Sequence, residues 1–377
     1  MNARPEVESL TAYSAPLEGR RGLLRLDFNE NTVGPSPAVV EAIRAIPADH
    51  YAIYPEYDGL REAVLASLRS EAGCPADRAL AGGLVEAQVG LFNGADAAIH
   101  ALFHAYGSPG DTLLTTSPTF GYYTPCARMQ GMAIEAIPYQ GPAFAFPLEA
   151  ITLALAARPR LLLICNPNNP TGTRLAPERI LDLASSAPGT LVVVDELYEA
   201  FTGDSVLPPL LRAADAGDDP FAAVPNLLVL RSLAKTAGLA GLRIGFAIGA
   251  AAVVDRISRV TGPYDINSFA VTAARAALAD SAYVDAYVAE VLRARAWLLE
   301  ELRKAGVRHH ADGGNYLLIW PRSAAAQVEE RLRAAGILVR SMAGKPLIDG
   351  SLRVSLGTLE QMQRFWAAYR RIEPELN

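Results

Sequence analysis

The sequence predicts an α/β fold, in which a mostly parallel sheet of about seven strands is flanked by helices. From about residue 88, short apolar runs alternate with stretches that have helical periodicity. Several of these runs are apolar on both faces, which is typical of strands buried in a parallel sheet. The runs are Val89–Phe92, Thr112–Thr116, Ala133–Ile137, Leu161–Cys165, Leu191–Val194, Leu227–Leu230 and Ile244–Ile248.

The chain ahead of these strands divides into an irregular segment and two helices. Residues 1–35 carry scattered prolines and glycines, which predicts an extended N-terminal arm. Ser36 and Pro37 then predict the start of a helix, because a hydroxyl caps the first turn and proline suits its first position. A second helix is predicted over Gly59–Arg69.

After Pro263 the pattern changes to that of a smaller α+β domain. Two helices come first, followed by a strand, a helix and two short strands. In order these are Ala270–Ala279, about Tyr283–Lys304, Asn315–Trp320, about Ala324–Ala335, Ile337–Arg340 and Leu352–Ser355. We therefore expect an arm over 1–35, a large domain over 36–262 and a small C-terminal domain over 263–377.

The composition is that of a chain with a substantial core, since 51% of its 377 residues are hydrophobic and 20% are charged. The net charge is −6 and Lys and Arg are not concentrated anywhere, so nucleic acid and anionic membranes are poor candidates as partners. No signal-peptide core and no run of about 18 apolar residues is present, which predicts a cytoplasmic protein. The three cysteines lack the CxxC spacing of a zinc site or a disulfide framework.

Polar and charged side chains follow four of the predicted strands. Ligands of an open α/β sheet collect at the carboxyl ends of its strands. These ends carry a helix N-terminus, an amide, a carboxylate, a phenol and an amine, a set that suits a phosphorylated, carbonyl-bearing, aromatic cofactor. The groups are Asn93–Asp96, Asn166–Gly172, Asp195 with Glu196 and Tyr198, and Ser232 with Lys235.

Lysine is scarce in this chain, and one of its lysines lies among these strand ends. Lysine occurs only at Lys235, Lys304 and Lys345, although Lys and Arg together number 34. An amine can become neutral and form a Schiff base, whereas a guanidinium cannot. Lys235 is therefore the candidate for covalent attachment of a carbonyl group.

Eight motifs in one order carry a resemblance that spans nearly the whole chain. They are LDFNENTVGPSP (26–37), NGAD (93–96), SPTFGYY (117–123), NPNNPTGT (166–173), VVVDELYEAF (192–201), RSLAKTAGLAGLRIGF (231–246), GILVR (336–340) and LRVSLGT (352–358). The chain resembles a fold-type-I pyridoxal-phosphate aminotransferase and is most similar to the histidinol-phosphate aminotransferase family. The resemblance implies pyridoxal 5′-phosphate as cofactor and a homodimer with shared active sites.

Carried over position by position, the resemblance assigns the ring-binding residues of the large domain. Lys235 would form the Schiff base, Asp195 would pair with the pyridine nitrogen, and Phe120 would stack on the ring. Asn169 and Tyr198 would hydrogen-bond the 3′-oxygen. The resemblance, together with the need to aim Asn169 at the cofactor in a tight turn, also implies that the Asn169–Pro170 peptide bond is cis.

The resemblance also assigns a phosphate site and a substrate site. The phosphate would be held by the amides of Ala95 and Asp96, together with Ser232 and Arg243. Tyr54 would reach the phosphate of the partner subunit's cofactor. The residues expected to face the substrate are Arg353, Arg340 and, from the arm of the other subunit, Tyr13.

Two positions depart from the common pattern, because Ala234 and Ala95 stand where many relatives have serine. The implied reaction moves an amino group between glutamate and histidinol phosphate. Aromatic amino acids are the alternative substrates, and decarboxylation of a phosphorylated amino acid is an alternative reaction on the same fold. A cofactor-binding regulator without turnover and a nucleotide-binding protein are rivals of other classes. His100 and His104 have the i, i+4 spacing of metal ligands, but no third ligand is apparent, so no metal site is expected.

Overall fold

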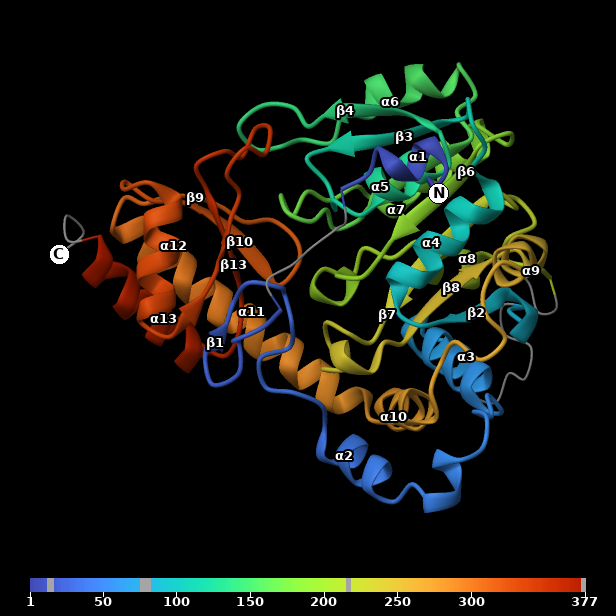
Figure 1. The fold of residues 1–377 in the computed structure, drawn as a ribbon, viewed down its shortest axis with the longest axis horizontal. Helices are drawn as coiled ribbons and strands as arrows, with labels where there is room; N and C mark the ends of the chain where they lie inside the picture. Colours follow the sequence, from blue (N-terminus) through green and yellow to red (C-terminus); the bar gives the residue numbers. More distant parts are fainter. Residues whose placement is uncertain (12–16, 75–82, 215–217, 374–377) are drawn as a thin grey trace.

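The computed structural model describes residues 1–11, 17–74, 83–214 and 218–373, and its largest element is a seven-stranded sheet (Figure 1). The strand order is β2-β8-β7-β6-β5-β3-β4. Strand β8 is antiparallel to both of its neighbours, and the other pairs are parallel. The predicted sheet is thus confirmed, and its strands are β2 (Val89–Phe92), β3 (Thr112–Ser117), β4 (Ala133–Pro138), β5 (Leu161–Cys165), β6 (Leu191–Asp195), β7 (Leu227–Ser232) and β8 (Gly245–Gly249).

The central strands are buried along their whole length. Every residue of β5 and β6 is buried, as the apolar runs of these strands require. Cys165 is the register partner of Asp195, which is in turn the partner of Leu230. The carboxyl ends of β5, β6 and β7 therefore lie side by side at one edge of the sheet.

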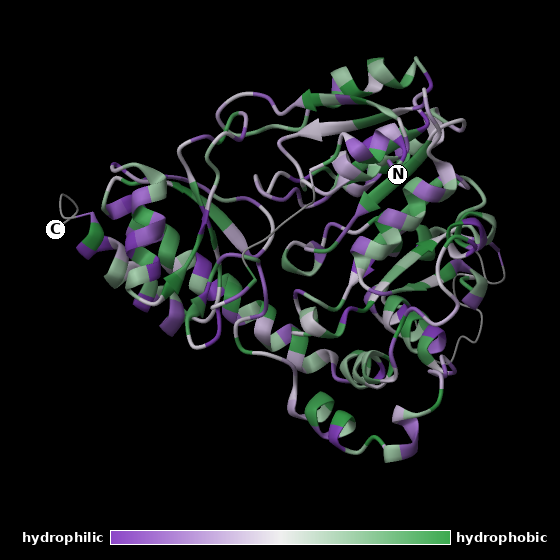
Figure 2. Cartoon of the chain, viewed as in Figure 1, coloured by the Kyte–Doolittle hydropathy of each residue, from purple (hydrophilic) through white to green (hydrophobic). Residues whose placement is uncertain are grey.

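Helices cover this sheet and share one core with it. Hydrophobic residues run along the strands, while the helices alternate hydrophobic and hydrophilic residues (Figure 2). Ser36 caps α2 through its hydroxyl, which accepts a hydrogen bond from the Val39 amide, so the predicted helix start is confirmed. The helices are α2 (Pro37–Arg44), α3 (Leu60–Glu71), α4 (Ala95–Tyr106), α5 (Tyr123–Met129), α6 (Leu148–Leu155), α7 (Pro177–Ser186), α8 (Leu207–Ala213), α9 (Ala251–Ser258) and α10 (Ser268–Ala279).

A second, antiparallel sheet has the order β12-β13-β10-β9 and a core of its own. The single strand predicted over Ile337–Arg340 is two strands in the structure. Its first part, Ile337–Leu338, belongs to a separate two-stranded sheet, and Arg340 begins a strand of the second sheet. The strands are β9 (Arg308–His310), β10 (Tyr316–Trp320), β12 (Arg340–Ser341) and β13 (Leu352–Ser355), and the helices are α11 (Ser281–Lys304), α12 (Ala325–Ala334) and α13 (Leu359–Ile372).

Part of the expected N-terminal arm packs against the core of the second sheet. Strand β1 (Leu24–Arg25) pairs in parallel with β11 (Ile337–Leu338), and Leu24 and Leu26 lie in the second core. At the other end of the arm, α1 (Pro5–Glu8) lies beside α5 (Figure 1). The division into arm, large domain and small domain stays a prediction, and α10 belongs to the core of the first sheet.

Among the described residues, no helix is long and apolar enough to cross a membrane.

Candidate active site

The start of α4 lies at the carboxyl end of β2. Its N-cap residue, Gly94, has a φ of 81° and no side chain that could cap the helix. The first amides of a helix have no partner within it and carry the positive end of its dipole. Gly245 of β8 lies directly beneath, because a Cβ there would stand 2.5 Å from the Ala95 nitrogen.

Arg243 lies beside this helix start, whereas Ser232 is engaged in its own turn. The Arg243 guanidinium donates to the Asp96 carboxylate at 3.0 Å, and a Cβ at Gly94 would stand 2.7 Å from the same nitrogen. The Ser232 hydroxyl donates to the carbonyl of Ile244 at 2.9 Å and accepts from the amide of Ala234 at 3.2 Å. The structure thus brings Arg243 and Asp96 together, and Ser232 stands on the neighbouring strand.

Asp195 ends β6 as a buried carboxylate with 2% of its surface exposed. The Tyr123 hydroxyl donates to its Oδ2 at 2.5 Å, and the Leu197 amide donates to its Oδ1 at 3.3 Å. Burial raises the pKa of Asp195 to about 6, although both hydrogen bonds act in the opposite direction. The carboxylate is thus held by a tyrosine that the sequence analysis did not assign.

Lys235 follows β7 and points back to the N-terminal segment. Its Nζ donates to the carbonyl of Phe28 at 3.0 Å and lies 5.9 Å from the centre of the Tyr198 ring. Loss of water around the amine and, second, the positive charge of Arg353 lower the pKa of Lys235 to about 8. The neutral amine, which is the nucleophilic form, is therefore more populated near neutral pH than in an ordinary lysine.

Tyr198, Asn169 and Asn29 form one hydrogen-bonded group. The Tyr198 hydroxyl accepts from the amide nitrogen of Asn169 at 3.4 Å and from that of Asn29 at 3.1 Å. Asn29 is 1% exposed and has a φ of 55°, a region that few residues other than glycine adopt. The Asn169–Pro170 bond is cis, so that prediction is confirmed.

Arg353 of β13 reaches the same network from the second sheet. Its guanidinium donates to Asn169 Oδ1 at 2.7 Å and to the carbonyl of Asp27 at 2.5 Å. Arg340 is its register partner on β12, so both side chains leave the same face of the sheet. The Arg340 guanidinium lies 5.7 Å from the centre of the Phe28 ring. It also lines a recess of about 230 Å³ together with Asp27, Glu329, Glu330 and Arg333.

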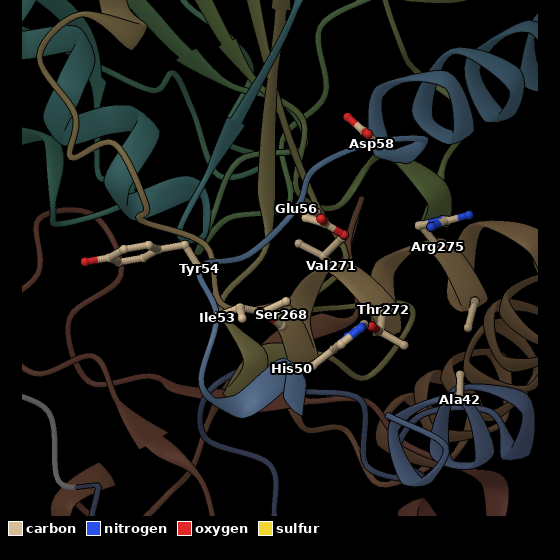
Figure 3. Close-up of a pocket in the computed structure, with 11 residues that line it drawn as sticks. Ala42, His50, Ile53, Tyr54, Glu56, Asp58, Ser268, Val271, Thr272 and Arg275 are labelled. Carbon is tan, nitrogen blue, oxygen red and sulfur yellow. The ribbon is translucent and has the colours of Figure 1, made fainter. Parts of the chain in front are cut away.

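Two other expected residues make aromatic contacts. Phe120 is half-buried, and its ring meets that of Tyr123 edge-on with the centroids 5.4 Å apart. Tyr54 is 71% exposed, stacks on Tyr264 and points away from the recess of about 370 Å³ that it borders (Figure 3). That recess contains none of the residues around Lys235. Tyr13 lies outside the described residues.

An ion cluster centred on Arg231 lies at the ends of β6 and β7. Arg231 of β7 contacts Glu196 at 2.9 Å, Glu71 at 3.0 Å and also Glu199. Its guanidinium further donates to the hydroxyl of Ser205 at 2.7 Å. The cluster ties the end of β6 to the end of β7, and these two ends carry Asp195 and the turn to Lys235.

Sequence reasoning missed Tyr123, Asn29 and the Phe28 carbonyl. All three lie inside motifs that were noted, SPTFGYY and LDFNEN, but sequence spacing does not show that Tyr123 meets a residue 72 positions away. His100 and His104 place their Nε2 atoms 3.0 Å apart. In the part of the chain that the structure describes, no group of three metal-ligating side chains forms around them.

Comparisons with known proteins identify the family and support the fold. Residues 21–368 match the model of the family "Aminotransferase class I and II". The chain is 34% identical to the histidinol-phosphate aminotransferase of Roseiflexus castenholzii over 95% of this chain and 94% of that one. It is 30% identical to the enzyme of the same name from Moorella thermoacetica, over 94% and 86% of the two chains. A solved histidinol-phosphate aminotransferase of Sinorhizobium meliloti, in complex with pyridoxal-5′-phosphate, has a TM-score of 0.83 at 23% identity and covers 99% of this chain and 98% of its own; it supports the fold.

Proposed function

The chain belongs to the aminotransferase class I and II family, and from this premise we propose that it exchanges an amino group between glutamate and histidinol phosphate, with pyridoxal phosphate as cofactor. One observation carries the proposal most directly. A half-buried lysine amine, with its pKa lowered to about 8, shares the strand-end site with a buried carboxylate whose Oδ2 a tyrosine holds.

The residues of the site fit pyridoxal phosphate. Its phosphate suits the start of α4, where the lack of a Cβ at Gly94 and Gly245 lets Arg243 and β8 approach the first turn closely, with Arg243 adding a cation. The aldehyde requires an amine, which Lys235 supplies. The pyridine nitrogen requires an anion, which Asp195 supplies. When bound, the cofactor provides the electron sink for the charge left at the substrate's Cα.

The remaining assignments concern the ring and its proton transfers. We assign Asn169 and Tyr198 to the 3′-oxygen, because the two already share a hydrogen bond. Phe120 is assigned to the ring face and Ser232 to the phosphate. Lys235, once free of the cofactor, is the base that moves the proton at the substrate's Cα, a role typically worth about 10²–10⁴-fold in rate.

The substrate assignment rests on the names of the relatives and on two arginines of the second sheet. Arg353 is held in place by Asn169 and by the Asp27 carbonyl, which pre-orients it for a carboxylate or a phosphate. Arg340 leaves the same face and adds a second fork-shaped donor. Histidinol phosphate carries the dianion that two arginines favour, and phenylalanine does not.

We further propose a homodimer in which Tyr54 and the arm, Tyr13 included, serve the partner's site. The exposed side chains of Tyr51, Tyr54 and Tyr264 support this. The cysteines Cys74, Cys126 and Cys165 are free thiols, which fits a reducing compartment, and we place the enzyme in the cytoplasm.

The test is a panel of amino donors with 2-oxoglutarate. We expect histidinol phosphate to give the highest kcat/KM, with phenylalanine and tyrosine far below it. A higher value for an aromatic amino acid would replace the substrate assignment. Release of carbon dioxide from a phosphorylated amino acid, without glutamate formation, would replace the reaction itself.

A further inference from the structure

The carboxylate of Asp195 lies among groups from five segments of the chain. Tyr123 faces it from α5 and Cys165 from β5, while Asp96 at the start of α4 adds negative charge. Lys235 adds positive charge from the turn after β7, and the amide of Leu197 donates from the segment after β6. Of these groups, the Tyr123 hydroxyl makes the shortest contact, at 2.5 Å.

Tyr123 is built into the core to make this contact. It is the first residue of α5, is 1% exposed and packs edge-on against Phe120. Burial, followed by the negative charge of Asp195, raises the pKa of the Tyr123 phenol well above its usual value of 10.0. The phenol therefore keeps its proton and acts as a donor throughout the physiological range.

We infer that Tyr123 is a positioning residue for Asp195, holding its carboxylate charged and in one orientation toward the cofactor's ring nitrogen; this inference rests on the proposed function. A hydrogen bond to the charged form of an acid favours that form. Without it, burial alone would favour the neutral carboxyl. A neutral carboxyl could not keep the ring nitrogen protonated, so the site would lose its electron sink while its other contacts stay in place.

The first test uses the protein without cofactor. The protein carries ¹³C in its aspartate carboxyls, and Asp195→Asn identifies the signal of Asp195 in an NMR titration. Asp195 should titrate with a pKa of about 6 in the native protein. In Tyr123→Phe it should be a weaker acid by about 10- to 100-fold, the equivalent of a hydrogen bond to a charged group. Equal acidity of the two proteins, within threefold, would overturn the inference.

A matched control removes a different buried phenol. Tyr139 is 3% exposed, and its hydroxyl accepts from Thr116. Tyr139→Phe should leave the titration of Asp195 unchanged. If Tyr123→Phe does not fold, 3-fluorotyrosine at position 123 keeps the shape and makes the phenol a stronger donor. Asp195 should then become a stronger acid than in the native protein, and an unchanged or weaker acid would contradict the inference.

The second test adds pyridoxal phosphate labelled with ¹⁵N in its ring. The native protein should give the signal of a protonated ring nitrogen, and Tyr123→Phe should shift that signal toward the unprotonated form at neutral pH. In kinetics, kcat should fall about 10- to 100-fold while KM for the amino donor changes less than threefold. A larger change in KM than in kcat would indicate a merely structural role. If the native protein binds no cofactor, the proposed function fails, whereas the titration still decides the role of Tyr123.

Discussion

At the scale of single residues, the site depends on a few side chains whose charge states are set by burial. The surroundings of Lys235 lower the pKa of its amine, and those of Asp195 raise the pKa of its carboxyl. Each shift favours the neutral form of the group. The Tyr123 hydroxyl and the charges of a bound cofactor would favour the charged form of the Asp195 carboxyl.

Reduction with borohydride tests the lysine directly. We expect protein loaded with pyridoxal phosphate to carry the label on the peptide of Lys235, because its amine is half-buried in the site. Lys235→Ala should keep reversible cofactor binding and lose nearly all transamination. Lys304→Ala serves as the control, since that amine pairs with Glu301 on the surface of α11. Label recovered on Lys304 or Lys345 would refute the assignment.

Arg340 is the residue that we expect to discriminate between histidinol phosphate and phenylalanine. Arg340→Ala should reduce kcat/KM for histidinol phosphate more than for phenylalanine, by about 1.5–3 kcal/mol, because one charged hydrogen bond to the phosphate is lost. Arg333→Ala, in the same recess, is the matched control and should change both substrates little. Arg353→Ala should impair every substrate. Equal losses for both substrates in Arg340→Ala would remove its discriminating role.

At the scale of elements, the start of α4 is held in place by a glycine of a neighbouring strand. Gly245→Ala would bring a Cβ to 2.5 Å from the Ala95 nitrogen, and a backbone atom cannot yield as a flexible side chain can. The helix start should shift, and cofactor affinity should fall about tenfold or more, as expected when a charged hydrogen bond is lost. Gly241→Ala is the control, because nothing lies within 4 Å of its Cβ. Unchanged affinity in Gly245→Ala, measured by calorimetry, would contradict the phosphate site.

The ion cluster of Arg231 makes a prediction about pH and stability. Burial is the largest influence on Glu199 and raises its pKa above 4.5, although Arg231 acts in the opposite direction. The native state therefore holds a proton that the unfolded chain releases, so this group lowers the free energy of unfolding as pH rises from about 4.5 through the native pKa.

Glu199→Gln removes this titration. Above the native pKa the variant should be more stable than the native protein, and its stability should fall less with pH. Urea unfolding at several pH values measures both. Glu178→Gln, on the exposed face of α7, should leave the native pH profile unchanged. A Glu199→Gln profile that is parallel to the native one would show that Glu199 does not take up this proton.

At the scale of the whole molecule, an exposed apolar surface near Tyr54 indicates a partner. Tyr51, Ile53, Tyr54 and Tyr264 are each more than half exposed, and Tyr54 and Tyr264 stack on each other. Monomeric proteins rarely leave such clusters in water. A second copy of the chain is the occupant that we propose, and sedimentation should show a dimer.

Mixing Lys235→Ala with Tyr54→Ala, which we expect to be impaired as well, tests whether the sites are shared. Lys235→Ala lacks the amine, and Tyr54→Ala lacks the contact that we propose to the partner's cofactor. In a mixed dimer, one site would receive Lys235 from one subunit and Tyr54 from the other. About a quarter of the native activity should return after unfolding and refolding the two together. Activity that stays at the level of the separate variants would show that Tyr54 acts within its own subunit or not at all.

The sequence by itself determined the strands of the large sheet and most of the site's residue types. Short apolar runs such as those of β5 and β6 are typical of strands buried in a parallel sheet. Parallel strands bring their carboxyl ends to one edge of that sheet. Asp195, Asn169 and Lys235 could therefore be placed together without coordinates. The resemblance to a known family added the roles of these residues.

Only the tertiary structure decided which groups from distant segments meet. Periodicity reports the faces of an element and says nothing about contacts between residues far apart in the chain. For that reason Tyr123 on Asp195 and Asn29 on Tyr198 were not predicted. The same limit applies to β1, since a pair of two-residue strands has too few residues to leave a pattern, and its pairing with β11 depends on the packing of the second core.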